Sequence, residues 1–243
     1  MPIFHYKKKS GNTSTGFDEM GFAMPYDMAR DAGCGLMRWV DDNTVLYLPM
    51  YGDAPFVDQS NNSYVFTNTG VSVVNDVTPI SGGQGAAHFT AANQYLLSPS
   101  NMLAGLTEFT LEFDYMLDSI PTGNNWNTAF YFASNGANSS ADGTDMRLEK
   151  NYITVQMNHD NGLVKSDYTP DTGVWHTLRI SRNADSVVSI SIDNELINSY
   201  TDTNALYSSQ SYGYVLGRSE PTGEAGTGFR GYIANYRISN IVR

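Results

Sequence analysis

The sequence predicts an all-β protein in which two antiparallel sheets pack face to face, with an extended arm before the first strand. Three observations carry this prediction. From residue 44 onward, short segments with alternating apolar and polar residues follow one another. Turn residues separate these segments at spacings of roughly ten residues, as sandwiches require. No long stretch has the period of an amphipathic helix, which argues against a fold of alternating strands and helices.

The composition suits a folded domain with an acidic surface. Hydrophobic residues make up 41% of the 243 residues and aromatic residues 12%, which is enough for a sizeable core. The formal net charge is −11, and an acidic surface repels phosphate backbones, so we expect no nucleic-acid partner. No stretch approaches the length of a membrane span, so we expect no membrane partner. The single cysteine, Cys34, cannot form an intramolecular disulfide.

Residues 1–43 differ from the rest and are predicted to form an arm, whereas residues 44–243 form the sandwich. The arm contains a basic run from Lys7 to Lys9 and a flexible stretch from Ser10 to Gly16, and it lacks alternation. Because a segment with little core of its own is usually ordered by a surface that it lies against, we expect the arm to bind a partner or a second copy of the chain. The alternative is a disordered leader or tag. The candidate assembly residues are Phe4, Tyr6, Phe17, Met20, Phe22 and Met24.

The clearest strand covers residues 108–117, where apolar residues at every second position would face the core. Its second face, which includes Glu112 and Asp114, is expected to be solvated. Further strands are predicted at residues 45–48, 129–133, 146–148, 152–157, 175–181, 187–193, 214–217 and 231–239.

Three local features refine this picture. Asp193 and Asn194 predict a two-residue turn between alternating strands, because Asn tolerates a positive φ. Gly82 and Gly83 predict a tight crossing of the chain. Trp175 is expected to fill the core, where its indole N–H needs one partner.

Four segments carry a family resemblance. Residues 45–62 hold a strand followed by Asp58-Gln59-Ser60, residues 82–113 hold a glycine-rich turn before the long strand, residues 173–196 hold a Trp-His strand with its hairpin, and residues 229–238 hold a closing strand. In this order they resemble laminin-G-like jelly rolls of the concanavalin A-like class. The resemblance implies a two-sheet jelly-roll sandwich of the kind found in phage structural proteins, such as capsid-decoration and tail-fibre proteins.

Glu112 and Asp114 invite comparison with an enzyme site. Glycoside hydrolases of concanavalin A-like fold place carboxylates on alternate residues of one strand, with a second catalytic Glu three residues after the Asp. Retaining chemistry needs two such groups about 5–5.5 Å apart. Leu117 occupies that position here, so we expect no enzyme activity. His88 and His176 are assigned structural roles.

Related jelly rolls often hold one calcium ion at the rim of the sandwich, so the resemblance implies candidate oxygen ligands at Asp53, Asp58 and Asn61. The closing strand of the family usually supplies an acidic residue, but this chain has Ala234-Asn235 there. We therefore expect that no cofactor is required, with Ca²⁺ as an optional ligand.

A glycan site is predicted in the loops, where Trp126 stands among amides that can bind hydroxyl groups. The alternative is that Trp126 plugs the edge of the core. The candidate ligand-binding residues are Asn124, Asn125, Trp126, Asp142, Asp145, Asn158 and Asp160.

Three functions follow. The first is a non-catalytic virion structural protein, either capsid decoration or a tail-fibre adhesion module, which its arm anchors to other virion proteins or into a homo-oligomer. No apolar segment follows the lysines of the arm, so we expect no secretory signal, synthesis in the host cytoplasm and a location in the virion. The second is a free carbohydrate-binding module. The third is a glycan hydrolase or lyase, which the missing carboxylate disfavours.

Overall fold

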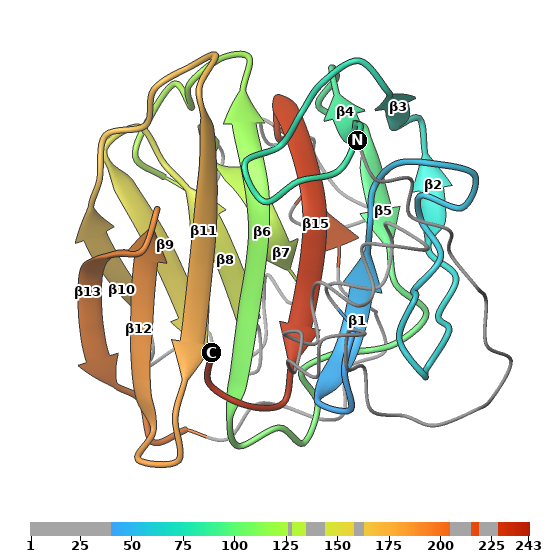
Figure 1. Cartoon of the computed structure of the whole chain (residues 1–243). Coiled ribbons are helices and arrows are strands. Elements are labelled where there is room, and N and C mark those ends of the chain that lie inside the picture. The colour runs from blue at the N-terminus through green and yellow to red at the C-terminus, as the bar shows by residue number, and fades with distance from the viewer. Residues whose placement is uncertain (1–39, 126–127, 135–143, 158–162, 205–214, 219–227) are drawn as a thin grey trace, which may run out of the picture. The chain divides into compact units, whose positions relative to one another are not determined.

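A computed structural model describes residues 40–125, 128–134, 144–157, 163–204, 215–218 and 228–243. The regular elements of these residues, β1 to β15, are strands that form two antiparallel sheets (Figure 1). The prediction of an all-β, two-sheet jelly-roll sandwich is therefore confirmed. No helix of the described residues is long and apolar enough to cross a membrane. All six candidate assembly residues of the arm lie outside the described residues.

The larger sheet has eight strands, and the last strand of the chain lies in its interior. In spatial order it contains β13 (Glu195–Thr201), β12 (Val187–Ile192), β11 (Trp175–Arg182), β6 (Phe109–Leu117), β15 (Gly231–Ser239), β4 (Ala86–Phe89) and β3 (Ser72–Val74), and β1 (Thr44–Leu48) also pairs with β15. Strand β15 thus joins segments from both ends of the described chain.

The second sheet has seven strands and lies behind the first in Figure 1. In spatial order it contains β10 (Leu163–Asp167), β9 (Tyr152–Met157), β8 (Thr144–Leu148), β7 (Phe130–Ser134), β14 (Val215–Leu216), β5 (Tyr95–Leu97) and β2 (Thr67–Thr69). The predicted hairpin of residues 146–148 and 152–157 is confirmed as β8 and β9.

Aromatic side chains from both sheets fill the space between them. Phe113 of β6 lies with its ring centroid 5.1 Å from that of Phe132 of β7 and 5.3 Å from that of Tyr236 of β15. All three are at most 1% exposed. Burial of one such side chain contributes roughly 1.5–3 kcal/mol, so this contact between the sheets is a main source of stability.

The outer face of β6 is not solvated, and the prediction of a half-buried strand is wrong there. Glu112 is 4% exposed and Asp114 is 0% exposed. Two arginines from neighbouring strands, Arg179 and Arg237, cover the Glu112 carboxylate, and Ser81 from the β3–β4 connection covers Asp114. The charged residues of β6 alternate with apolar ones because the charged side chains form a buried polar layer on the outer face of the sheet. Alternation in the sequence looks the same whether that face is covered or exposed to water.

Trp175 does not fill the core, so that prediction is also wrong. Leu178 and Ile180 of β11 belong to the core, and side chains alternate along a strand. Trp175 therefore faces outward with Thr177 and Arg179, and it is half-buried near the ring of Tyr232. The family motif located the strand correctly but not the face that carries this side chain.

The predicted turns are confirmed. Asp193 and Asn194 have φ values of 52° and 67°, and they join β12 to β13 as a two-residue turn. Gly82 and Gly83 have φ values of 96° and 108°. A bulge in β15 places Asn235 at a φ of 53°, which turns its amide toward Asp114 and the carbonyl of Gly82.

Candidate functional site

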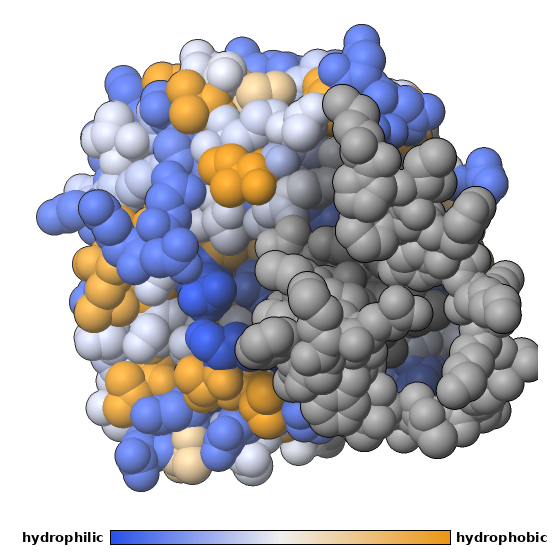
Figure 2. Space-filling model, viewed as in Figure 1, coloured by the Kyte–Doolittle hydropathy of each residue, from blue (hydrophilic) through white to orange (hydrophobic). Residues whose placement is uncertain are grey.

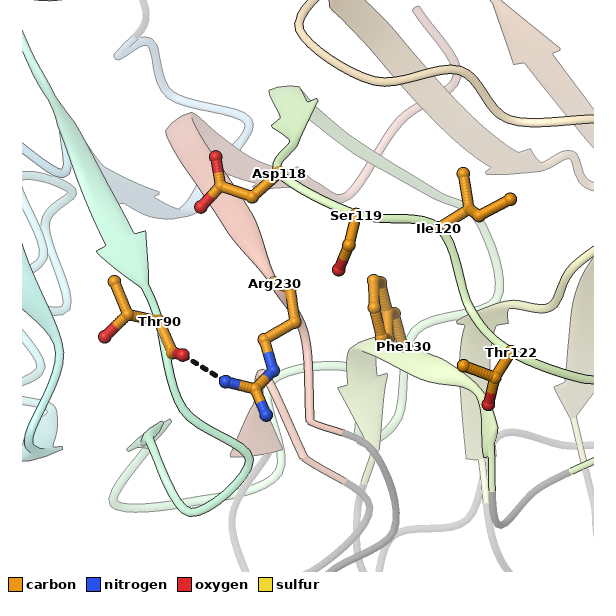
Figure 3. Close-up of a pocket in the computed structure, with 7 residues that line it drawn as sticks. All are labelled: Thr90, Asp118, Ser119, Ile120, Thr122, Phe130 and Arg230. Atoms are coloured by element: carbon orange, nitrogen blue, oxygen red, sulfur yellow. Dashed lines mark hydrogen bonds between the residues drawn. The ribbon is translucent and has the colours of Figure 1, made fainter.

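A pocket of about 420 Å³ opens at one end of the sandwich, and we call it the rim pocket (Figure 3). Its size lies within the range of pockets that bind small molecules, which runs from about 300 to 1,000 Å³. The pocket is lined by Thr90, Asp118, Ser119, Ile120, Thr122, Phe130 and Arg230.

Strand pairing brings these residues together from distant parts of the sequence. Gly231, the first residue of β15, pairs with Phe89 at the end of β4 and with Leu117 at the end of β6. Thr90 follows β4, Asp118 follows β6 and Arg230 precedes β15, so all three lie at the same end of the sheet. Phe130 begins β7 in the opposite sheet, so the pocket spans both sheets.

Gly231 is the residue that permits this close approach. A Cβ atom at this position would lie 2.1 Å from the carbonyl oxygen of Met116, and the φ of Gly231 is 142°. Only glycine combines this backbone conformation with such a close neighbouring strand. The glycine therefore positions Arg230 on one side and Tyr232 on the other.

The lining of the rim pocket contains both polar and apolar side chains. The guanidinium of Arg230 donates a hydrogen bond to the carbonyl of Thr90, and Figure 3 shows Arg230 between Thr90 and Phe130. The amide of Asp118 donates to the carbonyl of Arg230 at 3.1 Å, which fixes the two charged residues side by side. Ile120, which is 40% exposed, contributes apolar surface, and Phe130, which is 2% exposed, completes the apolar part of the lining. Such a pocket offers donors, acceptors and an apolar surface to one small polar ligand.

A second cavity, of about 220 Å³, lies on the outer face of the eight-stranded sheet and contains the two carboxylates of β6. Glu112 accepts hydrogen bonds from Arg237 Nε at 2.7 Å and from Arg179 Nη2 at 3.2 Å. Asp114 accepts them from Ser81 Oγ at 2.7 Å and Thr177 Oγ1 at 2.8 Å. Protein donors thus occupy both carboxylates, which favours a structural role for each.

The three predicted calcium ligands lie in the connection after β1, but Asp58 is directed at hydrogen-bond donors. Its carboxylate accepts from the amide of Tyr47 at 2.8 Å, the amide of Ser60 at 2.8 Å and the Ser60 hydroxyl at 2.6 Å. Asp53 and Asn61 are exposed. Among the described residues, no group of three His, Cys, Asp or Glu side chains converges on a metal position. The set around Asp58 therefore does not fit a calcium ion, because its oxygens already satisfy N–H and O–H groups.

Three of the predicted glycan ligands are described, and each has a partner within the chain. The Asn124 side chain accepts from the amide of Asn151 at 3.1 Å, and Asn125 accepts from the Thr128 hydroxyl at 3.1 Å. Asp145 is 8% exposed and lies within β8 beside Arg147. The other four, Trp126, Asp142, Asn158 and Asp160, lie outside the described residues. The glycan site of these loops stays a prediction.

Sequence reasoning did not single out any residue of the rim pocket. Its residues are ordinary strand ends in the sequence, and only the joint pairing of Gly231 with Phe89 and Leu117 makes them neighbours. The signal that was available is the Arg230-Gly231 pair, a charge beside a glycine at the start of the closing strand.

The fold with its closing strand between β4 and β6 agrees with a family comparison. A family model, Laminin_G_3, described as the concanavalin A-like lectin/glucanases superfamily, matches residues 90–243. The chain belongs to this family. The matched residues include all seven that line the rim pocket of this laminin-G-like domain. A comparison with curated proteins finds no match.

Solved structures share the fold at low sequence identity. The binding domain of Paraclostridial mosquitocidal protein 1 matches 83% of this chain with a TM-score of 0.60 and 15% identity, and the binding domain of botulinum neurotoxin serotype D matches 83% with a TM-score of 0.61 and 15% identity. The laminin-G-like domain covers only 50% and 48% of those two chains.

A shorter structure matches over most of its own length. Domain 4 of AbnA, a GH43 extracellular arabinanase from Geobacillus stearothermophilus, was solved in complex with arabinotriose. It matches 76% of this chain and 86% of its own, with a TM-score of 0.56 and 13% identity. At such identities the likeness is one of fold.

Proposed function

We propose that this protein is a non-catalytic, lectin-like domain that binds a carbohydrate in the rim pocket. The observation that carries the proposal is the composition of this pocket, whose lining combines the charged Asp118 and Arg230 with the apolar Phe130 and Ile120. A sugar has hydroxyl groups that both donate and accept hydrogen bonds, and C–H faces that pack against apolar side chains. The pocket offers a partner for each.

Two further observations support the proposal. The fold likeness to domain 4 of AbnA, solved with arabinotriose, supports a sugar as the ligand class. The absence of catalysis is supported by Glu112 and Asp114, whose oxygens are held by protein donors, and by Leu117 at the position of the second hydrolase carboxylate.

The finer proposal is a role in a virion, as capsid decoration or as a tail-fibre adhesion module that displays the lectin-like domain. It is supported by the resemblance to phage structural proteins and by the composition of residues 1–43, which lack strand alternation. In this proposal the arm anchors the chain to other virion proteins or to a second copy. A free carbohydrate-binding module remains the alternative, because it needs the rim pocket but no arm.

The sugar proposal predicts that the two charged residues of the rim pocket control binding. A glycan array first identifies the glycan that the unaltered chain binds best. Arg230→Ala and Asp118→Asn should each lower the affinity for this glycan by about 10-fold to 100-fold, because hydrogen bonds to charged groups contribute roughly 1.5–3 kcal/mol. Calorimetric titration measures the affinity. The control is Asp185→Asn, an exposed carboxylate in the turn between β11 and β12. Unchanged affinity in both pocket variants would contradict the proposal.

The virion proposal predicts that residues 1–40 are needed for assembly but not for the sandwich. A chain that begins at Asp41 keeps the ion pair of Asp41 with Arg243, so it should unfold at the temperature of the full chain. Size-exclusion chromatography with light scattering should show an oligomer for the full chain and a monomer for the shorter one. Two monomers would instead favour the free binding module.

A further inference from the structure

Four side chains form a row across the outer face of the eight-stranded sheet, next to the rim pocket, and we call them the outer row. His88 of β4 pairs with Tyr232 of β15, Tyr232 pairs with Met116 of β6, and Met116 pairs with Trp175 of β11. Each of the four is half-buried. Because paired residues point to the same face of a sheet, the row presents its side chains to one surface.

The rings of the outer row are in mutual contact. His88 and Tyr232 stack with centroids 4.0 Å apart and ring planes within 6°. The Trp175 ring lies 6.2 Å from that of Tyr232, tilted by 53°. Val174, which precedes Trp175, is 48% exposed, so apolar surface extends past the end of the row. Figure 2, viewed as Figure 1, shows that hydrophobic residues elsewhere on this face of the molecule are scattered among hydrophilic ones.

The outer row is continuous with the rim pocket. His88 Nε2 lies 2.7 Å from Oδ2 of Asp118, and Asp118 also lines the pocket. Arg230 immediately precedes β15 and Tyr232 is its second residue, so the same end of this strand supplies both the pocket and the row. A ligand seated against Asp118 therefore has the row as its next surface.

Acidic side chains lie near Tyr232 in the row, whereas Arg230 supplies a positive charge in the rim pocket. Asp118 and Asp76 both act electrostatically on Tyr232, and the whole chain carries a net charge of −11. Uronic and sialic acids carry a negative charge, so the negative charges of the protein would repel them. The row favours the C–H faces of uncharged sugars, which pack on aromatic rings without bringing a charge.

We infer that the outer row is an extension of the rim pocket that packs against further sugar units, so that the ligand is an uncharged oligosaccharide lying across the strands. The inference rests on the proposed sugar-binding function. The row crosses three gaps between neighbouring strands, or about 14 Å, because strands in a sheet lie ~4.8 Å apart. This length accommodates a short chain of linked sugars rather than a single one.

The test measures affinity against ligand length. The probes are glucose to cellotetraose, arabinose to arabinotetraose and N-acetylglucosamine to chitotetraose, with oligogalacturonides as acidic probes. Titrations of the full chain should show an affinity that rises from one to three units in one uncharged series, and no binding of the acidic series. Trp175→Ala and Tyr232→Ala should lower the affinity for the three-unit probe by roughly tenfold. They should leave the affinity for the single sugar unchanged.

Two further variants separate contact from folding. Trp175→Leu keeps an apolar side chain opposite Met116 but removes the ring, so it should bind as weakly as Trp175→Ala. Tyr64→Ala is the control, because Tyr64 is also half-buried but lies in the connection after β1, and β1 pairs with the opposite end of β15. Tyr64→Ala should bind every probe like the unaltered chain.

The outcomes distinguish the inference from the function on which it rests. If the row variants bind the three-unit probe normally while Arg230→Ala does not, the extension is wrong and the rim pocket stands. If affinity does not rise with length, or the acidic series binds best, the inference is also overturned. If the unaltered chain binds no probe, both the sugar-binding function and the extension fail.

Discussion

Asp114 shows how one residue can hold a surface together. Its buried carboxylate receives four hydrogen bonds, from the amide and hydroxyl of Ser81, the hydroxyl of Thr177 and the amide group of Asn235. Ser81 belongs to the β3–β4 connection, so Asp114 ties this connection to the sheet. A carboxylate that accepts several hydrogen bonds can stay buried without a cation, because these donors replace its water.

Replacing this residue should therefore be costly. We expect Asp114→Ala to lower the free energy of unfolding by about 2–3 kcal/mol, because it leaves several buried donors without an acceptor. Urea unfolding followed by fluorescence measures the change. Asp185→Ala, at an exposed carboxylate, should change stability by less than about 0.5 kcal/mol. A loss below about 1 kcal/mol for Asp114→Ala would show that Asp114 does not hold the connection.

At the scale of single residues, the sequence located both carboxylates of β6 but assigned them the wrong surroundings. Alternation places Glu112 and Asp114 on the face away from the core, and this is correct. It does not say whether that face meets water. The two arginines that cover Glu112 are far from it in the sequence: Arg179 is 67 positions away and Arg237 is 125 positions away. No local sequence pattern reports such contacts.

At the scale of elements, His176 links the start of β11 to two neighbouring connections. Its Nδ1 lies 2.7 Å from Asp193 Oδ2, in the turn between β12 and β13, and its Nε2 lies 2.8 Å from Asp171 Oδ1. Burial alone would lower the pKa of His176. The hydrogen bonds and charges of Asp193 and Asp171 outweigh burial, so the pKa is raised above its usual value of 6.5.

This raised pKa predicts a pH dependence of stability. A folded-state pKa above the unfolded value means that protonated His176 stabilises the fold fully below about pH 6.5. This contribution is then lost as the pH rises through the raised pKa. Urea midpoints measured at intervals from pH 5.5 upward should fall over this window in the unaltered chain and fall less in His176→Gln. Parallel curves for the two chains would show that the ion pairs contribute no pH-dependent stability.

The elements themselves were well predicted, because the information that specifies them is local. The turn at Asp193-Asn194 needs two residues that accept positive φ, and the sequence shows them between two alternating segments. Trp175 was assigned to the wrong face of β11. Trp175 is the first residue of its strand, so few neighbouring residues indicate which face of the sheet its side chain occupies. Leu178 and Ile180 of the same strand lie in the core, and alternation from them places Trp175 on the outer face.

At the scale of the whole molecule, the closing strand holds the sandwich together. Strand β15 pairs with β1, β4 and β6, and it contributes Ile233, Tyr236 and Ile238 to the core. These contacts join residues from the beginning, middle and end of the described chain. Long-range pairing of this kind makes folding depend on the presence of the last strand.

Removing the closing strand should consequently abolish the fold. We expect a chain that stops before Gly231 to show no cooperative thermal transition, because β1, β4 and β6 lose a pairing partner and the core loses three large side chains. Circular dichroism during heating measures this loss. The chain that begins at Asp41 is the matched comparison, since it also lacks one terminus but keeps β1 to β15, the strands of the described residues. A cooperative transition in the chain without β15 would contradict this account of the fold.

The sequence by itself determined the fold class, most of the strands, the positions of the tight turns and the family resemblance. These follow from alternation and backbone preferences, which neighbouring residues carry. Only the tertiary structure decided what lies on the outer faces. It placed Arg179 and Arg237 on Glu112, turned Trp175 outward, and built the rim pocket where β4, β6 and β15 end together. The physical reason is that a site made by strand pairing depends on which strands become neighbours, and that choice is made by contacts between residues far apart in the chain.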